Sequence, residues 1–154
     1  MPEFSPQFIG RWQGTNTLYL DWPSKGEFES PTRLEVAAIL EQRFFEFHYD
    51  WQHEGKTHQG VVLIGEDLKP GALCATWRDS WHQSDIMSCC GNAEGPDDLS
   101  INGSYLADDD GPEWHWRIHW QLLNADALRL RMYNISPEGA ESLAVAADFA
   151  RQAA

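Results

Sequence analysis

The sequence predicts an all-β protein, a single antiparallel up-and-down barrel of about ten strands with a short N-terminal helical turn. Three observations predict this fold. Apolar and polar residues alternate with period two in several stretches, Pro and Gly turn signals recur roughly every ten to fifteen residues, and eight of the 154 residues are Trp. Bulky aromatic side chains favour sheets, and regular turns between short alternating runs are typical of a sandwich or barrel.

The alternation is clearest in four stretches. Strict alternation gives a strand one buried and one solvated face, which is the pattern of antiparallel sheets. The apolar faces are Leu34, Val36, Ala38 and Leu40; Phe45, Phe47, Tyr49 and Trp51; Trp114, Trp116, Ile118 and Trp120; and Leu128, Leu130 and Met132.

The elements follow from these runs and from the turns between them. Gly supplies positive φ and Pro presets φ at the first turn position, so their clusters mark where strands end. The clusters lie at residues 22–26, 54–56, 69–71, 94–96, 109–112 and 136–139. In chain order, a helical turn is expected within residues 2–9, followed by strands at 11–20, 32–41, 43–52, 57–65, 72–79, 85–91, 98–106, 113–122, 127–135 and 140–150.

The last of these strands has an alternative. Residues 140–150 are rich in Ala and Leu, and their propensity also allows a C-terminal helix. A strand is expected here because closure of the sheet requires a partner for the first strand. No repeat or linker interrupts the chain, so residues 1–154 are expected to form one domain.

Charge and cysteine content narrow the partners and the compartment. The formal net charge is −13, from 11 Lys and Arg against 24 Asp and Glu. Such a field repels phosphate backbones and anionic lipids, so neither nucleic acid nor a membrane is an expected partner. Simple solubility is the favoured explanation of the charge. No signal peptide or membrane-spanning run is expected, and the cysteines Cys74, Cys89 and Cys90 contain no CxxC pair, which favours a reducing compartment and a cytoplasmic protein. The sequence predicts no oligomeric state.

The start of the first strand carries a family resemblance. Gly10-Arg11-Trp12, with Gly14 two residues later, resembles the Gly-x-Trp motif of the calycin superfamily, which includes lipocalins and fatty-acid-binding proteins. Together with Trp-Arg-Asp-Ser-Trp-His at 77–82 and Asn-Ile-Ser-Pro-Glu-Gly at 134–139, it makes the chain look like an uncharacterised bacterial family of that superfamily. One departure is the segment 21–32, which is too short and too rich in Pro and Gly for the helical pair of fatty-acid-binding proteins.

The resemblance implies that Trp12 packs across one barrel end beneath an Arg of the last strand. Antiparallel closure places the end of the last strand beside the start of the first, and Arg151 shares parity with the inward residues there. We therefore expect Arg151 to stack on Trp12 beside Gly10. A frayed, solvated C-terminal Arg is the alternative.

The bore of such a barrel is the candidate functional site. Eight strands already hold side chains or one small ligand, and ten leave more room. By parity the lumen is apolar with few polar groups, which is typical of small-molecule sites. We expect it to bind a small, largely apolar molecule; side chains that fill the bore, leaving a rigid interaction scaffold, are the alternative. The candidate ligand-binding residues are Phe45, Phe47, Tyr49, Trp77, Asp79, His82, Tyr105, Trp116, Trp120 and Asn134.

Asp79 and His82 lie where a strand runs into a loop. A buried Asp79 requires a partner, for which His82 and Arg129 are candidates. The pair would serve as an anchor for a ligand head group or as the acid and base of an enzyme, whereas hydrogen bonds that order the loop are the favoured alternative. Ser80 and His82 are too close in sequence to meet along a strand, and no Gly-x-Ser-x-Gly elbow exists, so no catalytic residue is assigned.

No metal or cofactor is expected. His115 and His119 share a face about 13 Å apart, too far for one ion. His53 and His58 flank a turn and are interpreted as exposed hairpin histidines, while Cys89 and Cys90 face opposite ways. Some calycin-like barrels bind haem through an inward His. Parity places His48, His115 and His119 outside, which leaves only His82, so haem is not favoured.

Overall fold

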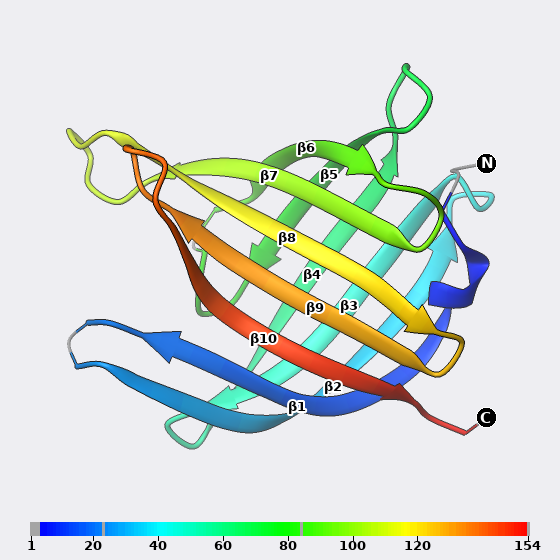
Figure 1. The fold of residues 1–154 in the computed structure, drawn as a ribbon, viewed down its shortest axis with the longest axis horizontal. Coiled ribbons are helices and arrows are strands. Elements are labelled where there is room, and N and C mark those ends of the chain that lie inside the picture. The colour runs from blue at the N-terminus through cyan, green and yellow to red at the C-terminus, as the bar shows by residue number, and fades with distance from the viewer. Residues whose placement is uncertain (1–3, 23, 84, 154) are drawn as a thin grey trace.

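The computed structural model describes residues 4–22, 24–83 and 85–153. Ten antiparallel strands close into a barrel, each beside its sequence neighbours, with β1 pairing β10 at the closure (Figure 1). In the described chain the only helical element is the three-residue 3₁₀ turn η1 (Pro6–Phe8), so the all-β prediction is confirmed. The strands are β1 (Gly10–Leu20), β2 (Gly26–Ile39), β3 (Phe44–His53), β4 (Lys56–Glu66), β5 (Ala72–Asp79), β6 (Met87–Ala93), β7 (Asp98–Leu106), β8 (Glu113–Asn124), β9 (Ala127–Ile135) and β10 (Glu141–Arg151).

The start of β2 was predicted wrongly. The strand begins at Gly26 rather than at residue 32, so the connection from β1 is only residues 21–25. The first part of β2 pairs with β1 alone, because the β2–β3 ladder begins at Arg33 opposite Asp50. Pro31 therefore lies in a segment with one free side, where its missing N–H removes no ladder hydrogen bond. The turn signals here had suggested a longer loop.

The Ala-rich C-terminal segment is a strand, as predicted. β10 pairs with β1 on one side and β9 on the other, with a register shift between Leu143 and Val145. Hydrogen bonds to two neighbouring strands outweigh a helix propensity that amounts to tenths of a kcal/mol per residue. The inner face of this strand is formed by Val145, Ala147 and Phe149, which are buried.

One end of the barrel is closed by the N-terminal segment, at the right in Figure 1. Phe4 and Phe8 are buried there, and their rings contact Phe45 at 4.6 Å and Phe47 at 5.8 Å between centroids. The ring of Phe47 in turn lies 4.6 Å from that of Trp120. Large side chains therefore fill this end of the bore, which we call the closed end.

Arg151 secures the closed end. Its guanidinium carbon lies 4.1 Å from the centre of the Trp12 ring, so the predicted stacking is present. The guanidinium also donates hydrogen bonds to the backbone oxygens of Gln7, Ile9 and Ala125, and the Trp12 indole donates to the oxygen of Phe8 at 3.0 Å. Gly10 is required here, because a Cβ at this position, where φ is 140°, would lie 2.5 Å from an Arg151 nitrogen.

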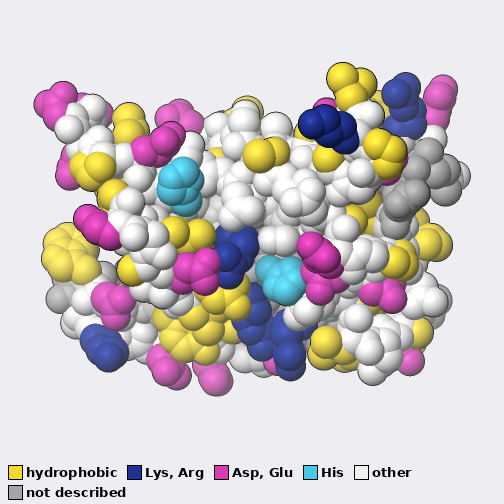
Figure 2. Space-filling view, turned by 45° about the horizontal axis from the view of Figure 1, so that its top comes forward, with side chains coloured by type: hydrophobic (Ala, Val, Ile, Leu, Met, Phe, Trp, Pro, Cys, Tyr) yellow, Lys and Arg dark blue, Asp and Glu magenta, His cyan; other side chains and the backbone are white. Residues whose placement is uncertain are grey.

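The outer wall carries the charged faces of the strands. Figure 2 shows acidic and basic side chains intermingled on the face it presents. Arg129 and Arg131 both approach Asp148, at 3.1 and 3.2 Å. Arg129 is therefore an outer-wall residue and does not partner Asp79, contrary to one of the sequence-based alternatives. As parity predicted, His48 and His115 are exposed.

Candidate functional site

A cavity of about 190 Å³ lies at the end of the barrel opposite η1. This end, which we call the mouth, carries the connections β1–β2, β3–β4, β5–β6, β7–β8 and β9–β10. We call the space the mouth cavity. It is lined by Trp77, Trp81, His82, Gln83, Met87, Tyr105 and Trp116, which come from β5, β6, β7, β8 and the β5–β6 loop.

A buried carboxylate organises the floor of the mouth. Asp79, the last residue of β5, is 1% exposed. One of its oxygens accepts hydrogen bonds from the Tyr49 hydroxyl at 2.8 Å and the Trp51 indole at 3.2 Å. The other accepts from the backbone N–H groups of Trp81 at 2.8 Å and His82 at 3.0 Å. Four donors satisfy the carboxylate, and two of them fix the β5–β6 loop.

This arrangement favours a structural role for Asp79. Its contact with His82 is through that residue's backbone N–H, and the hydrogen bonds order the loop as one interpretation of the sequence suggested. The hydroxyl of Ser80 accepts a hydrogen bond from the Gln59 backbone N–H at 3.0 Å. Neither contact gives the histidine ring a carboxylate or hydroxyl partner of the kind that general acid–base or nucleophilic catalysis uses.

Tyr49 reaches Asp79 because its neighbour on β4 has no side chain. A Cβ on Gly60 would lie 2.1 Å from the Tyr49 hydroxyl. The hydroxyl also accepts a hydrogen bond from the Trp77 indole at 2.9 Å. Burial and the nearby Asp79 carboxylate raise the pKa of Tyr49 well above 10, so the hydroxyl stays protonated and acts as a donor.

His82 is enclosed by four indole rings. Its ring centroid lies 5.3 Å from that of Trp51, 4.7 Å from Trp81, 5.3 Å from Trp116 and 6.0 Å from Trp77. Burial lowers the pKa of His82 from 6.5 to about 4, although Asp79 acts in the opposite direction. The imidazole is therefore neutral at pH 7.

This pKa predicts an acid-sensitive fold. The unfolded chain binds a proton at His82 near pH 6.5 and the folded protein only near pH 4, so stability is lost as the pH falls through this window. From pH 7.5 to pH 5 the free energy of unfolding should fall by about 2 kcal/mol through this residue. Urea denaturation at the two pH values measures the fall. His82→Gln should reduce this fall in the free energy of unfolding, whereas His115→Gln, at an exposed position, should leave it unchanged. An equal fall in both variants would exclude His82 as its cause.

Two further histidines face the mouth, which the sequence analysis did not predict. The side chain of His53 is only 7% exposed, and its ring contacts Phe28 at 5.0 Å and Trp81 at 5.7 Å. The ring of His58 lies 4.9 Å from that of Trp51. The interpretation of both as exposed hairpin histidines was therefore wrong, because β3 and β4 direct them toward the aromatic cluster around Trp51.

One donor in the wall of the mouth cavity has no partner. The Trp116 indole stacks on that of Trp77, with 5.3 Å between centroids and 7° between planes. Its N–H is buried and has no hydrogen-bond partner among the described residues. The N–H of Trp120 is likewise buried and without a partner among the described residues. Trp120, however, is 0% exposed and packs against Phe47 in the closed end. Of these two residues, only Trp116 lines the mouth cavity, although its N–H is itself buried.

The predicted ligand-binding residues divide into three groups. Trp77, His82, Tyr105 and Trp116 line the mouth cavity. Tyr49, Asp79 and Asn134 do not line it but hydrogen-bond residues that do: Tyr49 bonds Trp77, Asp79 bonds Trp81 and His82, and Asn134 accepts a hydrogen bond of 2.5 Å from the Tyr105 hydroxyl. The remaining residues, Phe45, Phe47 and Trp120, pack in the closed end.

Three lining residues were absent from the predicted set: Trp81, Gln83 and Met87. Trp81 and Gln83 belong to the β5–β6 loop, to which period-two parity does not apply. Met87 opens β6, whose alternation is weak because Ser, Gly and Cys follow it. The only available signal was that Trp81 belongs to the Trp-Arg-Asp-Ser-Trp-His motif at residues 77–82.

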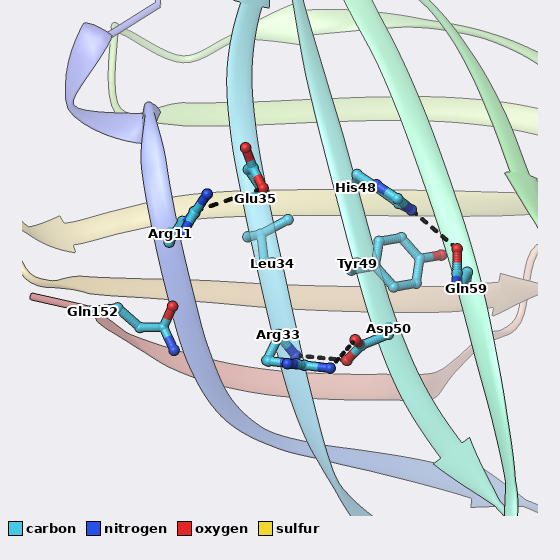
Figure 3. Close-up of a pocket in the computed structure, with 9 residues that line it drawn as sticks. All are labelled: Arg11, Arg33, Leu34, Glu35, His48, Tyr49, Asp50, Gln59 and Gln152. Atoms are coloured by element: carbon cyan, nitrogen blue, oxygen red, sulfur yellow. Dashed lines mark hydrogen bonds and ion pairs between the residues drawn. The ribbon is translucent and has the colours of Figure 1, made fainter. Parts of the chain in front are cut away.

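A second depression lies on the outer wall over β1–β4 (Figure 3). Its charged side chains already pair across the strands: Arg11 with Glu35 at 3.8 Å, and Arg33 with Asp50 at 3.1 Å. His48 lies 3.2 Å from the Gln59 side chain. Exposed pairs of this kind contribute about 0–1 kcal/mol each and leave no group that calls for a ligand.

No group of three or more metal-binding side chains occurs in the part of the chain that the structure describes. None of the described helical residues forms a segment long and apolar enough to cross a membrane. Haem does not fit this conformation, because four indoles surround His82 and the adjacent cavity is only about 190 Å³.

Comparison with known proteins identifies a family and a fold. Residues 5–151 match the model of a family described as "Protein of unknown function (DUF1579)". No curated protein shows significant sequence similarity. Among solved structures, Rv2717c from M. tuberculosis is similar, with a TM-score of 0.65 and 16% sequence identity over 97% of this chain and 99% of that one. At this identity the likeness supports the shared barrel fold alone.

Proposed function

The chain belongs to the DUF1579 family of proteins of unknown function, and from its own geometry we propose that it is a calycin-like barrel that binds a small, largely apolar molecule in the mouth cavity. The family description names no ligand, so the proposal depends on the side chains of the mouth. Its cavity is walled by indole, phenol and thioether groups together with the imidazole of His82 and the side-chain amide of Gln83.

The unpartnered Trp116 N–H is the observation that carries the proposal. A buried donor without an acceptor costs about 1–3 kcal/mol. Buried polar groups in folded proteins are nearly always hydrogen-bonded. The donor belongs to a wall residue of the mouth cavity but is itself buried, so an acceptor atom on a bound molecule removes the cost once the indole turns its N–H toward the cavity. Small-molecule sites combine apolar walls with a few such orienting groups.

The size of the cavity limits the ligand. Pockets for drug-sized molecules usually measure about 300–1,000 Å³, and the mouth cavity measures about 190 Å³. A single ring or a branched alkyl group with one acceptor fits these dimensions better than a fatty acid. The packed closed end also prevents a long chain from entering the bore.

Three free cysteines support a cytoplasmic location, which we propose together with the binding function. Cys74 and Cys90 are exposed and Cys89 is buried, and none is in a disulfide. Exposed unpaired thiols persist in reducing compartments.

A matched pair of probes tests the binding function by isothermal titration calorimetry. Acetophenone carries a carbonyl acceptor, and α-methylstyrene has the same shape without one. Acetophenone should bind about fivefold more tightly, since a hydrogen bond contributes about 0.5–1.5 kcal/mol. Trp116→Phe keeps an aromatic ring but removes the donor, so the preference should vanish. His115→Ala, at an exposed position of the same strand, should preserve it.

The outcomes separate the candidate functions. Binding of both probes without a preference would retain the apolar cavity and reject the role of Trp116. Absence of binding by either probe would reject the proposal and favour the rigid scaffold, with any function on the outer wall. An enzyme acting through Asp79 and His82 is not supported, because no hydrogen bond joins the His82 ring to a described carboxylate or hydroxyl.

A further inference from the structure

We propose that the physiological ligand of the mouth cavity is a small organic cation of the substituted-ammonium class that also carries a hydrogen-bond acceptor. This inference rests on the proposed binding function and adds the charge of the ligand. Three features support it: the charge of the mouth, the aromatic composition of the wall, and the unpartnered donor of Trp116.

The mouth is markedly acidic. Its connecting segments carry seven carboxylates against one lysine, Lys25. The carboxylates are Asp21, Glu54, Asp85, Glu138 and the three aspartates of residues 108–110. The connections at the closed end carry five carboxylates, Glu41, Asp67, Glu94, Asp97 and Asp126, against Arg43 and Lys69. Acidic side chains project from the loops at the left of Figure 2.

A cavity surrounded by charges of one sign concentrates ligands of the opposite sign, because low-dielectric walls focus the field. The mouth therefore attracts cations and repels carboxylates and phosphates. The cavity itself adds no positive charge, since none of its lining residues is Lys or Arg. His82 is neutral at pH 7 because burial lowers its pKa to about 4.

The wall provides the chemistry that holds a cation after it enters. Trp77, Trp81 and Trp116 contribute indoles and Tyr105 a phenol. The faces of aromatic rings, and of Trp above all, attract ammonium groups, and aromatic cages are a common way to bind quaternary ammonium. The Asp79 carboxylate holds two residues of this wall in place, because it accepts hydrogen bonds from the backbones of Trp81 and His82.

The unpartnered donor on Trp116, a residue of the cavity wall, favours a second group on the ligand. An ammonium group has no acceptor and leaves this N–H unpartnered. A hydroxyl, ether or carbonyl oxygen a few bonds away from the ammonium satisfies it. Choline has both groups in one small molecule, and 3,3-dimethylbutan-1-ol is its uncharged isostere, with carbon in place of nitrogen. These two compounds are the probes of the test.

Calorimetric titrations at low ionic strength should show choline binding about tenfold more tightly than 3,3-dimethylbutan-1-ol. The ratio of the two affinities should become smaller at 0.5 M NaCl, because salt screens the charges of the acidic mouth. Trp81→Leu removes one partly exposed aromatic face. It should therefore weaken the binding of choline several-fold more than the binding of the alcohol. Trp81 is 40% exposed, which makes this substitution tolerable for folding.

Charge-neutralising variants provide a second, independent measurement. Asp108→Asn, Asp109→Asn and Asp110→Asn together should reduce the choline preference. The matched control is Glu41→Gln, Glu94→Gln and Asp97→Asn, which removes the same charge from the closed end and should leave the preference nearly unchanged. If the two triple variants reduce the choline preference equally, the net charge of the protein, and not the carboxylates of the mouth, causes the preference.

The failure of this inference differs from the failure of the proposed function. If 3,3-dimethylbutan-1-ol binds as tightly as choline or more tightly, the proposal of a cationic ligand is wrong, while the mouth cavity remains a binding site for an uncharged molecule. Binding of acetophenone with no binding of choline would lead to the same conclusion. Absence of binding by acetophenone, choline and the alcohol would overturn both.

Discussion

Replacement of Trp12 by Ala should lower the free energy of unfolding by about 3–5 kcal/mol, as other large-to-small core substitutions do. Trp12 is 0% exposed at the closed end, beneath Arg151 and hydrogen-bonded to Phe8. The truncation leaves a cavity where η1, β1 and β10 meet and removes the surface on which the guanidinium lies. Urea denaturation monitored by circular dichroism measures the loss.

Two further variants should lose less stability than Trp12→Ala. Arg151→Ala should cost about 1–3 kcal/mol, because it removes the cation–π contact and three hydrogen bonds but leaves the core filled. Arg129→Ala, which removes an exposed ion pair with Asp148, should cost less than about 1 kcal/mol. Negligible losses for both Trp12→Ala and Arg151→Ala would show that these residues do not secure the closed end.

Replacement of Asp79 by Ala should be comparably severe and should also abolish ligand binding. The substitution leaves the Tyr49 hydroxyl, the Trp51 indole and two backbone N–H groups without their acceptor. Each buried donor left unpaired costs about 1–3 kcal/mol, and more where the partner was charged. We expect a total loss of about 3–5 kcal/mol, in the range found when one member of a buried charged network is removed.

The binding effect follows from the loop. Without the bonds to Trp81 and His82, the β5–β6 loop loses the geometry that forms one wall of the mouth cavity. Acetophenone binding should therefore disappear at a urea concentration and temperature where the variant is still folded by circular dichroism. Asp50→Ala, on the outer wall, is the control and should retain binding. A stable Asp79→Ala variant with normal binding would show that Asp79 does not organise the site.

Period-two alternation predicted the barrel and most of its interior. It succeeded because a strand directs successive side chains to opposite faces, and only one face of each strand meets the core. The inward positions of Tyr49, Trp77 and Trp116, and the exposure of His115, follow from this rule alone. The stacking of Arg151 on Trp12 was also predictable, since antiparallel closure fixes which strand ends are neighbours.

The functional end of the barrel was less predictable. Parity shows that a residue faces inward but not how far along the bore it lies relative to the other strands. Phe47 and Trp116 were therefore grouped together, although Phe47 packs on Phe8 in the closed end and Trp116 lines the mouth cavity. Their separation depends on the strand register around the barrel and on the N-terminal segment that fills one end.

The details of the loops were beyond the reach of the sequence pattern. Trp81 and His82 owe their positions to two backbone hydrogen bonds with Asp79, which no periodicity encodes. The inward orientation of His53 follows the same alternation as Trp51, and it was missed because the predicted strand ended at residue 52, one residue before the end of β3. The long β2 was missed because Pro31 suggests a turn unless the strand has a free side.

The indole N–H signals of the protein provide the most direct test of the mouth cavity as the binding site. Nuclear magnetic resonance spectra of ¹⁵N-labelled protein resolve these signals, and single Trp→Phe variants assign them. On titration with acetophenone, the Trp116 signal should shift most, as its N–H acquires an acceptor, while those of Trp12 and Trp120 in the closed end should remain in place. An unchanged Trp116 signal in the presence of bound acetophenone, or a larger shift at Trp12 or Trp120, would contradict the assignment of the site to the mouth.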